Sequence, residues 1–235
     1  MTSGDVPGRE SVLVIAAHPD DETLGCGGTM ARFSRIGIHV DVVICTRVGP
    51  HLTRYQTESV TNLDALRRAE ARKACKILGV RSVTFGTFEE IHDVSRPLPV
   101  LVDFLRTCLD ASRPSTVLSH HRGDLHQDHR AVAEATHIAL RPYASPGFVR
   151  RVLAYAIDPS SWIVRPCPTV FVPLAPADVK RKLRALRQYR SEIRDAPHPR
   201  SERSVEARAR AVGTTVGRLW AEEFELVWAR DVFSV

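Results

Sequence analysis

Two short segments of this chain concentrate the residue types that bind metal ions. The first follows an apolar run and reads His18-Pro19-Asp20-Asp21-Glu22. The second runs from His120 to His129 and contains four histidines and two aspartates. Imidazole nitrogens and carboxylate oxygens suit Zn²⁺ and chemically similar ions. The sequence therefore predicts a metal site assembled from two distant parts of the chain.

The spacing within these segments indicates which side chains hold the ion. A catalytic zinc site typically has three protein ligands and keeps a further position open. His18 and Asp21 are three positions apart, so one tight turn can present both to the same ion. His129, at the start of an expected helix, can complete the set. We therefore expect one divalent ion per chain, with Fe²⁺ as an alternative to Zn²⁺.

Alternating strand and helix patterns position these segments. Strands are expected at 11–17, 39–46, 81–85 and 115–119, and helices at 25–36, 63–78, 100–111 and 128–140. After residue 142 the pattern loosens, with strands expected at 151–157, 169–173 and 224–228 and helices at 178–190 and 202–219. Such alternation predicts an α/β, Rossmann-like fold with a mostly parallel sheet and flanking helices. The metal site should lie at the C-terminal ends of the strands.

Length and composition fit one globular unit. The chain has 235 residues, of which 43% are hydrophobic and 26% charged, which is ordinary for a soluble domain. We expect a flexible lead at 1–10 and one domain at 11–235, with a βα core at 11–141 and C-terminal strands and basic helices at 142–235. No apolar run reaches the ~20 residues of a membrane span. Because no signal-peptide pattern is present, a cytoplasmic location is expected.

The cysteines and the charge distribution argue against a disulfide-bonded protein and against a nucleic-acid-binding protein. Five cysteines without CxxC spacing indicate buried, reduced thiols. The net charge is +6, and the stretch 180–218 alone holds twelve Lys/Arg against four Asp/Glu, a balance of +8. A solvated helical surface explains this stretch better than nucleic-acid binding, because aromatic residues are scarce in it. A homo-oligomer is compatible with these observations.

Taken together, the motifs resemble the PIG-L/LmbE-like zinc-dependent N-deacetylases. The likeness rests on the AHPDDE segment at 17–22 after a strand, G-x-G-G at 25–28, Arg67-x-x-Glu70, DLHQDH at 124–129 and the stretch 182–191. The resemblance implies a Rossmann-like fold and removal of an acetyl group from an N-acetylated amino sugar. The substrate would be a small molecule, often an N-acetylglucosaminyl conjugate of specialised-metabolite or thiol-cofactor biosynthesis.

The resemblance also implies roles for individual residues. His18, Asp21 and His129 match the zinc ligands, and Asp20 matches the general base that takes a proton from zinc-activated water. His126 matches the imidazole that faces the carbonyl oxygen, and Asp128 the carboxylate that supports this ring and raises its protonated fraction. Further candidates for contacts with the substrate are Arg67, His121 and Asp124.

Two departures from the family pattern concern the substrate rather than the chemistry. The segment 87–94 lacks the Asp-Gly turn common in relatives, and Glu192 stands where relatives often have Gln. The loop at 47–62 and the basic C-terminal region are further candidates for setting specificity.

Several of these residues also have structural interpretations. Asp20 could cap the following helix, and Arg67 could pair with Glu70 one turn away. Glu22 is expected to bond amides of its own loop, and His120 could only line the pocket. The glycines at 25–28 lack the full dinucleotide-binding spacing.

Two other functions remain open on the sequence. Clustered Asp and His residues could hold the two metal ions of a phosphoesterase. A basic carbohydrate- or nucleic-acid-binding module with a relic site is the second alternative.

Overall fold

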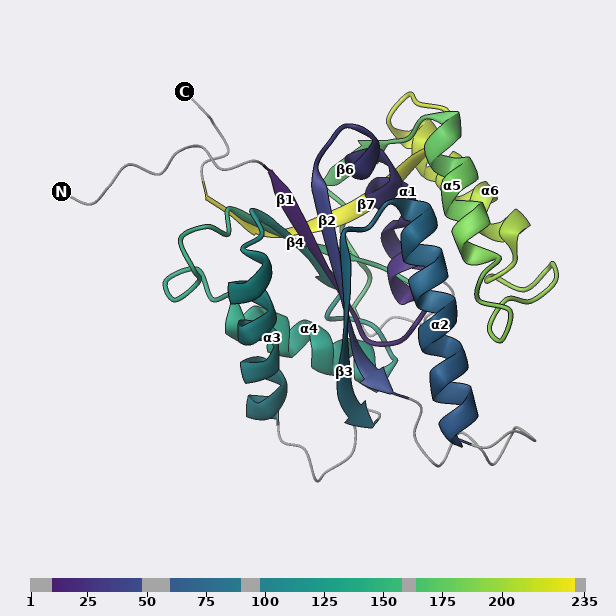
Figure 1. The fold of residues 1–235 in the computed structure, drawn as a ribbon. Coiled ribbons are helices and arrows are strands. Elements are labelled where there is room, and N and C mark those ends of the chain that lie inside the picture. The colour runs from purple at the N-terminus through teal and green to yellow at the C-terminus, as the bar shows by residue number, and fades with distance from the viewer. Residues whose placement is uncertain (1–9, 48–59, 90–97, 158–163, 231–235) are drawn as a thin grey trace.

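A computed structural model describes residues 10–47, 60–89, 98–157 and 164–230. Its seven-stranded sheet has the order β3-β2-β1-β4-β5-β7-β6 (Figure 1). The strands are β1 (Ser11–Ala16), β2 (His39–Arg47), β3 (Ser82–Glu89), β4 (Thr116–His120), β5 (Arg151–Tyr155), β6 (Val170–Pro173) and β7 (Ala221–Ala229). The helices are α1 (Asp21–Arg35), α2 (Val60–Leu78), α3 (Leu98–Ser112), α4 (Gln127–Ala139), α5 (Pro176–Leu186) and α6 (Glu202–Thr215).

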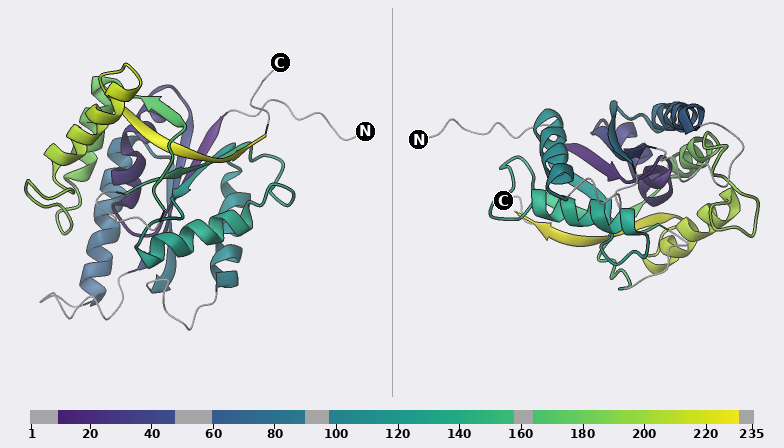
Figure 2. Two further views of the ribbon diagram at one scale, coloured as in Figure 1. Left: turned by 180° about the vertical axis from the view of Figure 1, so that it is seen from behind. Right: turned by 90° about the horizontal axis from the view of Figure 1, so that it is seen from below.

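The sheet is mostly parallel and lies between two layers of helices. β1 to β5 pair in parallel, whereas β7 is antiparallel to both β5 and β6. Helices α1, α2 and α5 cover one face, and α3 and α4 cover the other (Figures 1 and 2). The predicted α/β fold is therefore confirmed. The single-domain boundary at 11–235 stays a prediction, and of the expected lead at 1–10 only Glu10 lies within the described residues.

β1 is buried on both faces, which explains its continuous apolar sequence. Val12, Val14 and Ala16 pack into the core beneath α1 and α2. The alternate residues Leu13 and Ile15 pack into the core beneath α3 and α4. Because both faces of β1 pack into a core, the residues that directly follow this strand have a fixed position.

The topology brings the two His/Asp segments together. β1 pairs with β2 on one side and with β4 on the other, in a register that sets Val12 opposite Thr116 and Val14 opposite Leu118. The chain therefore builds β1, β2 and β3 outward and then crosses back to β4. Open α/β sheets bind ligands at such a switch point, beyond the C-terminal ends of the strands. The loops after β1 and β4 meet there.

Several helix boundaries differ from the expected ones, and two of the differences have local reasons. Helix α1 begins at Asp21 rather than at residue 25, because the Asp20 carbonyl already accepts the Thr23 and Leu24 amides. Helix α6 ends at Thr215 rather than at 219. Gly217 adopts a left-handed φ of 64°, and the Arg218 amide returns to the Gly213 carbonyl, which closes the helix.

The cysteine prediction holds for four of the five residues. Cys26, Cys45, Cys75 and Cys108 are buried free thiols, but Cys167 is free and exposed, contrary to the expectation. Among the described residues, the helices are too short or too polar to cross a membrane.

Candidate metal centre

Three imidazoles surround the buried carboxylate of Asp21. Its Oδ2 atom lies 3.3 Å from His18 Nδ1, 3.3 Å from His129 Nε2 and 3.4 Å from His120 Nε2. The His18 amide donates to the same oxygen at 2.8 Å, which folds the turn that carries both residues. Asp21 Oδ1 is buried and takes no hydrogen bond within the described part of the chain. An oxygen in this state has a free lone pair for a cation.

His129 is oriented by Asp124. The His129 Nδ1–H donates to Asp124 Oδ2 at 2.8 Å, which leaves Nε2 pointing toward Asp21. A carboxylate behind a histidine in this way fixes the tautomer that binds metal. Asp124 is 1% exposed and also accepts the His126 amide. Asp124 thus supports the His129 ring from a buried position, and its contact with the substrate stays a prediction.

His120 packs against the cluster and bonds the backbone next to it. Its Nε2 accepts the Ala17 amide at 2.9 Å, so this lone pair is already used. The ring stacks on His129, with centroids 4.2 Å apart. Burial, followed by the charge of His129, lowers the pKa of His120 to about 4. This neutral ring thus packs against His129, one of the candidate metal ligands.

The carboxylates make the centre strongly attractive to positive charge. The pKa of His18 is raised to about 10: burial lowers it, but contacts with Asp128 and Asp21 outweigh the burial. The pKa of His129 is raised to about 9 in the same way, by Asp21 and Asp124 against burial. Two neighbouring imidazoles that both favour the cationic form show how negative this pocket is. The donor set and its field therefore fit a divalent cation.

Asp128 and His126 are placed differently from the expectation. Asp128 Oδ2 accepts from His18 Nε2 at 2.8 Å, whereas its backbone amide donates to His126 Nδ1 at 3.3 Å. His126 thereby caps the start of α4. Burial and the charges of His18 and His129 lower the pKa of His126 to about 4, against the raising effect of Asp128. The expected rise in the protonated fraction is thus reversed.

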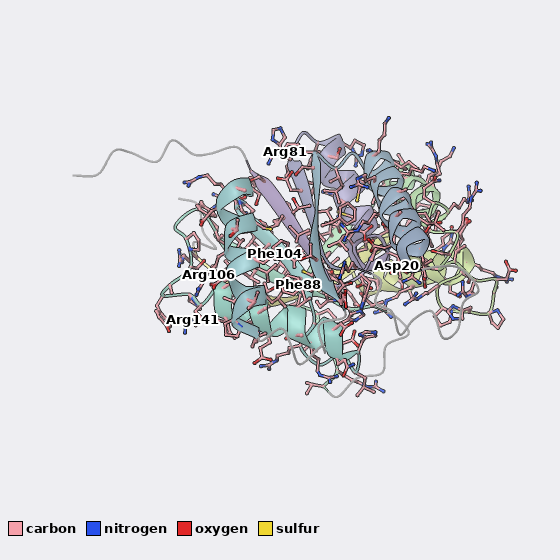
Figure 3. All side chains as sticks on the ribbon, turned by 60° about the horizontal axis from the view of Figure 1, so that its bottom comes forward. Asp20, Arg81, Phe88, Phe104, Arg106 and Arg141 are labelled. Carbon is pink, nitrogen blue, oxygen red and sulfur yellow. The ribbon has the colours of Figure 1, made fainter. Side chains whose placement is uncertain are left out.

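Asp20 is buried beside the ligands and does not cap α1. Its φ of 109° lies in the left-handed region, and its side chain makes no capping hydrogen bond. Oδ2 lies instead 3.1 Å from Arg200 Nη1. Burial raises the pKa of Asp20 to about 8, against the lowering effect of Arg200. Asp20 lies on the α2 side of the sheet, at the end that faces the viewer in Figure 3.

Glu22 has the structural role expected for it. The carboxylate is fully buried, and Oε2 accepts the Asp20 amide at 3.2 Å. Oε1 accepts from the hydroxyls of Thr23 and Tyr189. Glu22 thus ties the turn of Asp20 to the segment after α5.

The remaining predicted substrate contacts are held in internal pairs. Arg67 binds Glu192 rather than Glu70, which instead accepts from the Ser191 hydroxyl at 2.8 Å. His121 is 2% exposed; its Nδ1 accepts the Gly123 amide, and its Nε2 lies 3.3 Å from Glu225. His121 is thus buried, and its contact with the substrate stays a prediction. The segments 47–62 and 87–94, expected to set specificity, lie mostly outside the described residues.

The G-x-G-G segment serves close packing around a kink in α1. The helix is non-helical at Cys26. A Cβ at Gly25 would come within 2.3 Å of the Tyr155 ring, and one at Gly28 within 2.5 Å of Leu174. The small residues thus let α1 approach the sheet. This packing role agrees with the expectation that the glycines do not form a dinucleotide-binding site.

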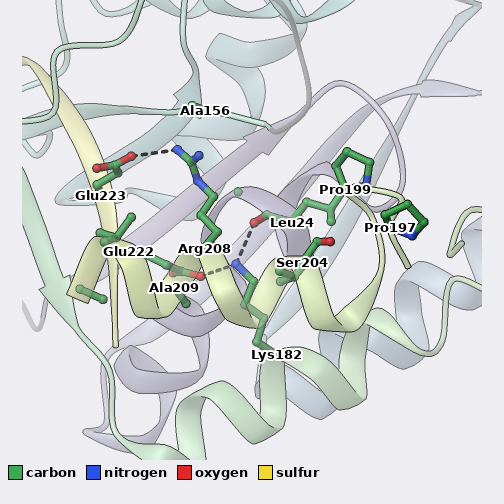
Figure 4. A pocket seen from close by; sticks show the side chains of 14 residues that line it. Leu24, Ala156, Lys182, Pro197, Pro199, Ser204, Arg208, Ala209, Glu222 and Glu223 are labelled. Carbon is green, nitrogen blue, oxygen red and sulfur yellow. Dashed lines mark hydrogen bonds and ion pairs between the residues drawn. The ribbon is translucent and has the colours of Figure 1, made fainter. Parts of the chain in front are cut away.

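A buried ion pair that sequence reasoning missed restores the hydrogen bonds lost at this kink. Lys182 Nζ donates to the Leu24 carbonyl at 2.8 Å and to Glu222 Oε1 at 2.6 Å (Figure 4). The Glu222 carboxylate accepts the amides of Gly28 and Thr29 at 2.9 and 2.6 Å. Only the position of Lys182 within the stretch 182–191 signalled a role. The pair lines a cavity of about 280 Å³ between α1, α6 and β7.

Residues 13–140, more than half of the chain, match the PIG-L family of GlcNAc-PI de-N-acetylases. The chain belongs to this family. The PIG-L match contains the loops after β1 and β4, and therefore every residue of the metal centre.

Individual PIG-L relatives are similar over different shares of the chain. The uncharacterized deacetylase YaiS of Escherichia coli K12 is 29% identical over 187 residues, which cover 78% of this chain and 92% of YaiS. A 1D-myo-inositol 2-acetamido-2-deoxy-alpha-D-glucopyranoside deacetylase of Actinosynnema mirum is 31% identical over 153 residues, about half of each chain (55% and 54%). The structure of N,N'-diacetylchitobiose deacetylase from Pyrococcus horikoshii superposes with a TM-score of 0.75 at 23% identity, covering 93% of this chain and 84% of that one. This last likeness concerns the fold.

Proposed function

We propose that this chain is a zinc-dependent hydrolase that removes the acetyl group from an N-acetylglucosaminyl conjugate. The observation that carries the proposal is the placement of His18 Nδ1 and His129 Nε2 at 3.3 Å from one Asp21 oxygen, with Asp20 buried beside them. Membership of a de-N-acetylase family supports the reaction. The relatives that act on an acetamido-glucopyranoside and on diacetylchitobiose support the sugar class.

His18, Asp21 and His129 would hold the ion. When bound, a divalent ion acts as a Lewis acid toward the acetyl carbonyl and lowers the pKa of a coordinated water to about 7. Asp124 fixes the His129 ring for this task, and the His18 amide fixes the Asp21 carboxylate. The same ligand set suits Fe²⁺, so metal analysis has to identify the ion.

Asp20 acts as the general base. A general base works best when its pKa lies near the working pH, and burial raises the pKa of Asp20 to about 8. The carboxylate is buried at the turn before α1 and adjoins the ligand Asp21, so it can take a proton from the attacking water. The left-handed backbone at Asp20 is a conformation that proteins retain chiefly at functional sites.

His126 acts as a neutral hydrogen-bond donor. Its Nδ1 accepts the Asp128 amide, so the single proton of the neutral ring resides on Nε2. This N–H can donate to the acetyl oxygen as negative charge develops there. A pKa of about 4 keeps the ring in this form at neutral pH. The structure thus favours neutral donation over the protonated imidazole expected from the sequence.

The decisive experiment measures acetate release by the metal-loaded protein. The panel would contain diacetylchitobiose, inositol-linked N-acetylglucosamine and a nucleotide-linked N-acetylglucosamine. We expect acetate from at least one compound, and release that is about 10²–10⁴-fold slower from the Asp20→Asn protein under the same conditions. Release of phosphate from phosphoesters without any acetate would contradict the proposal and favour the phosphoesterase.

The geometry gives the two-metal alternative little support. The two groups of possible ligands in the described residues, His18-His126-His129 and Asp21-His120-His129, share His129. His120 Nε2 is already bonded to the Ala17 amide. One ion per chain is therefore the expected stoichiometry, and two ions would overturn it.

Two arginines of the basic stretch 180–218 form ion pairs with acidic residues of this chain. Arg187 pairs with Glu202, and Arg208 with Glu223. Such pairing favours the solvated-surface interpretation over a nucleic-acid-binding module.

A further inference from the structure

A short series of ion pairs links the metal centre to the loop between α5 and α6. Arg200 Nη1 lies 3.1 Å from Asp20 Oδ2 and 3.0 Å from Glu192 Oε2. The other Glu192 oxygen binds Arg67 on α2. Arg200 therefore stands between Asp20, which adjoins the metal ligands, and Glu192, which is itself anchored to a helix.

The backbone of Arg200 is held at the start of α6. The Arg200 amide donates to His198 Nδ1 at 3.1 Å. The next residue, Ser201, caps α6 by accepting the Ser204 amide at 3.2 Å. The backbone of Arg200 therefore has a fixed position directly before the capped helix. The Arg200 side chain is 30% exposed, whereas the Asp20 side chain that it contacts is 3% exposed.

Asp20 needs such an external partner. As the N-cap residue of α1 it could have bonded its own helix amides, but its side chain does not. Its backbone amide is fixed by Glu22 at 3.2 Å, which leaves the rotamer of the carboxylate to be set by what lies opposite it. Arg200 lies opposite.

We propose that Arg200 is a positioning residue that holds the Asp20 carboxylate in its reactive orientation, with Glu192 as its second anchor. This inference rests on the proposed role of Asp20 as the general base. An arginine suits the task, because its planar fork offers several donors in fixed directions, whereas a lysine offers one point charge. The residue comes from the basic C-terminal region and lies outside the sequence motifs of the metal centre.

The test compares Arg200→Gln with Arg194→Gln. Arg194 is a matched control from the same loop, since its side chain bonds only the carbonyls of Ser191 and Ile193 in the described residues. A catalytic group displaced by about 1 Å can lose about 10²-fold in rate. We expect Arg200→Gln to lower kcat by about 10- to 100-fold, with KM, metal content and Tm close to the wild type. Arg200→Lys should recover part of the loss.

The second anchor provides an independent variant. Glu192→Gln should lower kcat by a smaller factor, and the double variant Arg200→Gln/Glu192→Gln should be no slower than Arg200→Gln alone, because both act through one carboxylate. If Arg200→Gln does not fold, Glu192→Gln and Arg200→Lys decide. Wild-type kcat in both would overturn the proposal.

A crystal structure of Arg200→Gln gives a readout that does not depend on turnover. We expect the Asp20 side chain in more than one rotamer, and a single rotamer identical to the wild type would overturn the positioning role. The two proposals fail in different ways. A wild-type protein that releases no acetate defeats the proposed function, whereas equal activity of wild type and Arg200→Gln defeats only the role of Arg200.

Discussion

Two buried charged clusters lie along α1, and they differ in how completely their groups are bonded. At the kink, Lys182 and Glu222 bind each other and the backbone groups that the kink frees. At the N-terminus of the helix, Asp21 faces imidazoles at 3.3–3.4 Å, and its Oδ1 takes no hydrogen bond in the described residues. A fully bonded buried pair favours one conformation, whereas an incompletely bonded group retains affinity for an external partner. The first cluster therefore shapes the helix, and the second can bind an ion.

Removal of a proposed metal ligand should have the largest effect. In His129→Ala we expect the metal content to fall from about one ion per chain to nearly none and activity to be lost, because a three-ligand site has no ligand to spare. Elemental analysis of purified protein measures this directly. His39→Ala, at the opposite end of β2, is the control. Wild-type metal content in His129→Ala would refute the ligand assignment.

A change at Asp20 separates chemistry from metal binding. Asp20→Asn should keep its ion, yet turnover should fall by about 10²–10⁴-fold, the usual effect of losing a general base. Steady-state kinetics on the best substrate, together with metal analysis, gives both values. Loss of the ion would instead make Asp20 a ligand and Asp21 the candidate base.

The next effect concerns the oxyanion donor. His126→Ala should lower kcat by about 10²–10³-fold with metal content unchanged, because a donor aimed at developing charge acts mainly in the transition state. A kcat within twofold of the wild type would show that another group stabilises that charge.

The bonded cluster is tested by stability rather than by turnover. Lys182→Met leaves the Glu222 carboxylate buried without its cation, and such a change typically costs about 3–5 kcal/mol of unfolding free energy. Chemical denaturation measures the loss. Lys182→Met/Glu222→Gln should recover part of it, because no unpaired charge remains. A loss below about 1 kcal/mol in the single variant would contradict the proposed role at the kink.

The smallest effect belongs to an ion pair nearer the surface. Asp178 accepts from Arg35 through both oxygens at 2.9 Å and from the Ala175 amide at 2.9 Å, and these bonds lower its pKa below 3.8 despite desolvation. A lowered pKa contributes stability above the ordinary value, and this contribution disappears as the pH falls through the folded-state pKa. Asp178→Asn should therefore cost about 1 kcal/mol at pH 7. The difference from wild type should shrink below about pH 4, and a constant difference would contradict the linkage.

Much of the fold was predictable because it depends on local patterns. The buried run of β1, its alternation between two cores and the helices between strands are visible in the sequence. Boundaries were less predictable. The start of α1 depends on amides that bond the Asp20 carbonyl, and the end of α6 depends on a glycine whose left-handed φ only the structure shows.

The sequence predicted that His18, Asp21 and His129 come together, but it did not predict the contacts of the residues around them. His18 and Asp21 share one turn, and His129 follows a strand whose end meets that turn. The roles of Asp124, His121 and Asp128 were assigned from motif position alone. Their partners depend on the direction in which each side chain points from α4 or from the loop before it. Sequence spacing does not fix this direction.

The family, the fold class and the candidate ligands could be predicted from the sequence, because short-range spacing and apolar periodicity encode them. Only the tertiary structure revealed that Arg200 contacts Asp20 across 180 positions of sequence and that Glu222 bonds the Gly28 amide across 194. Such contacts arise when a charged side chain on one element reaches polar groups on another that lack a partner within their own element. Their specificity comes from burial, which makes an unbonded charge costly, and burial is a property of the folded chain.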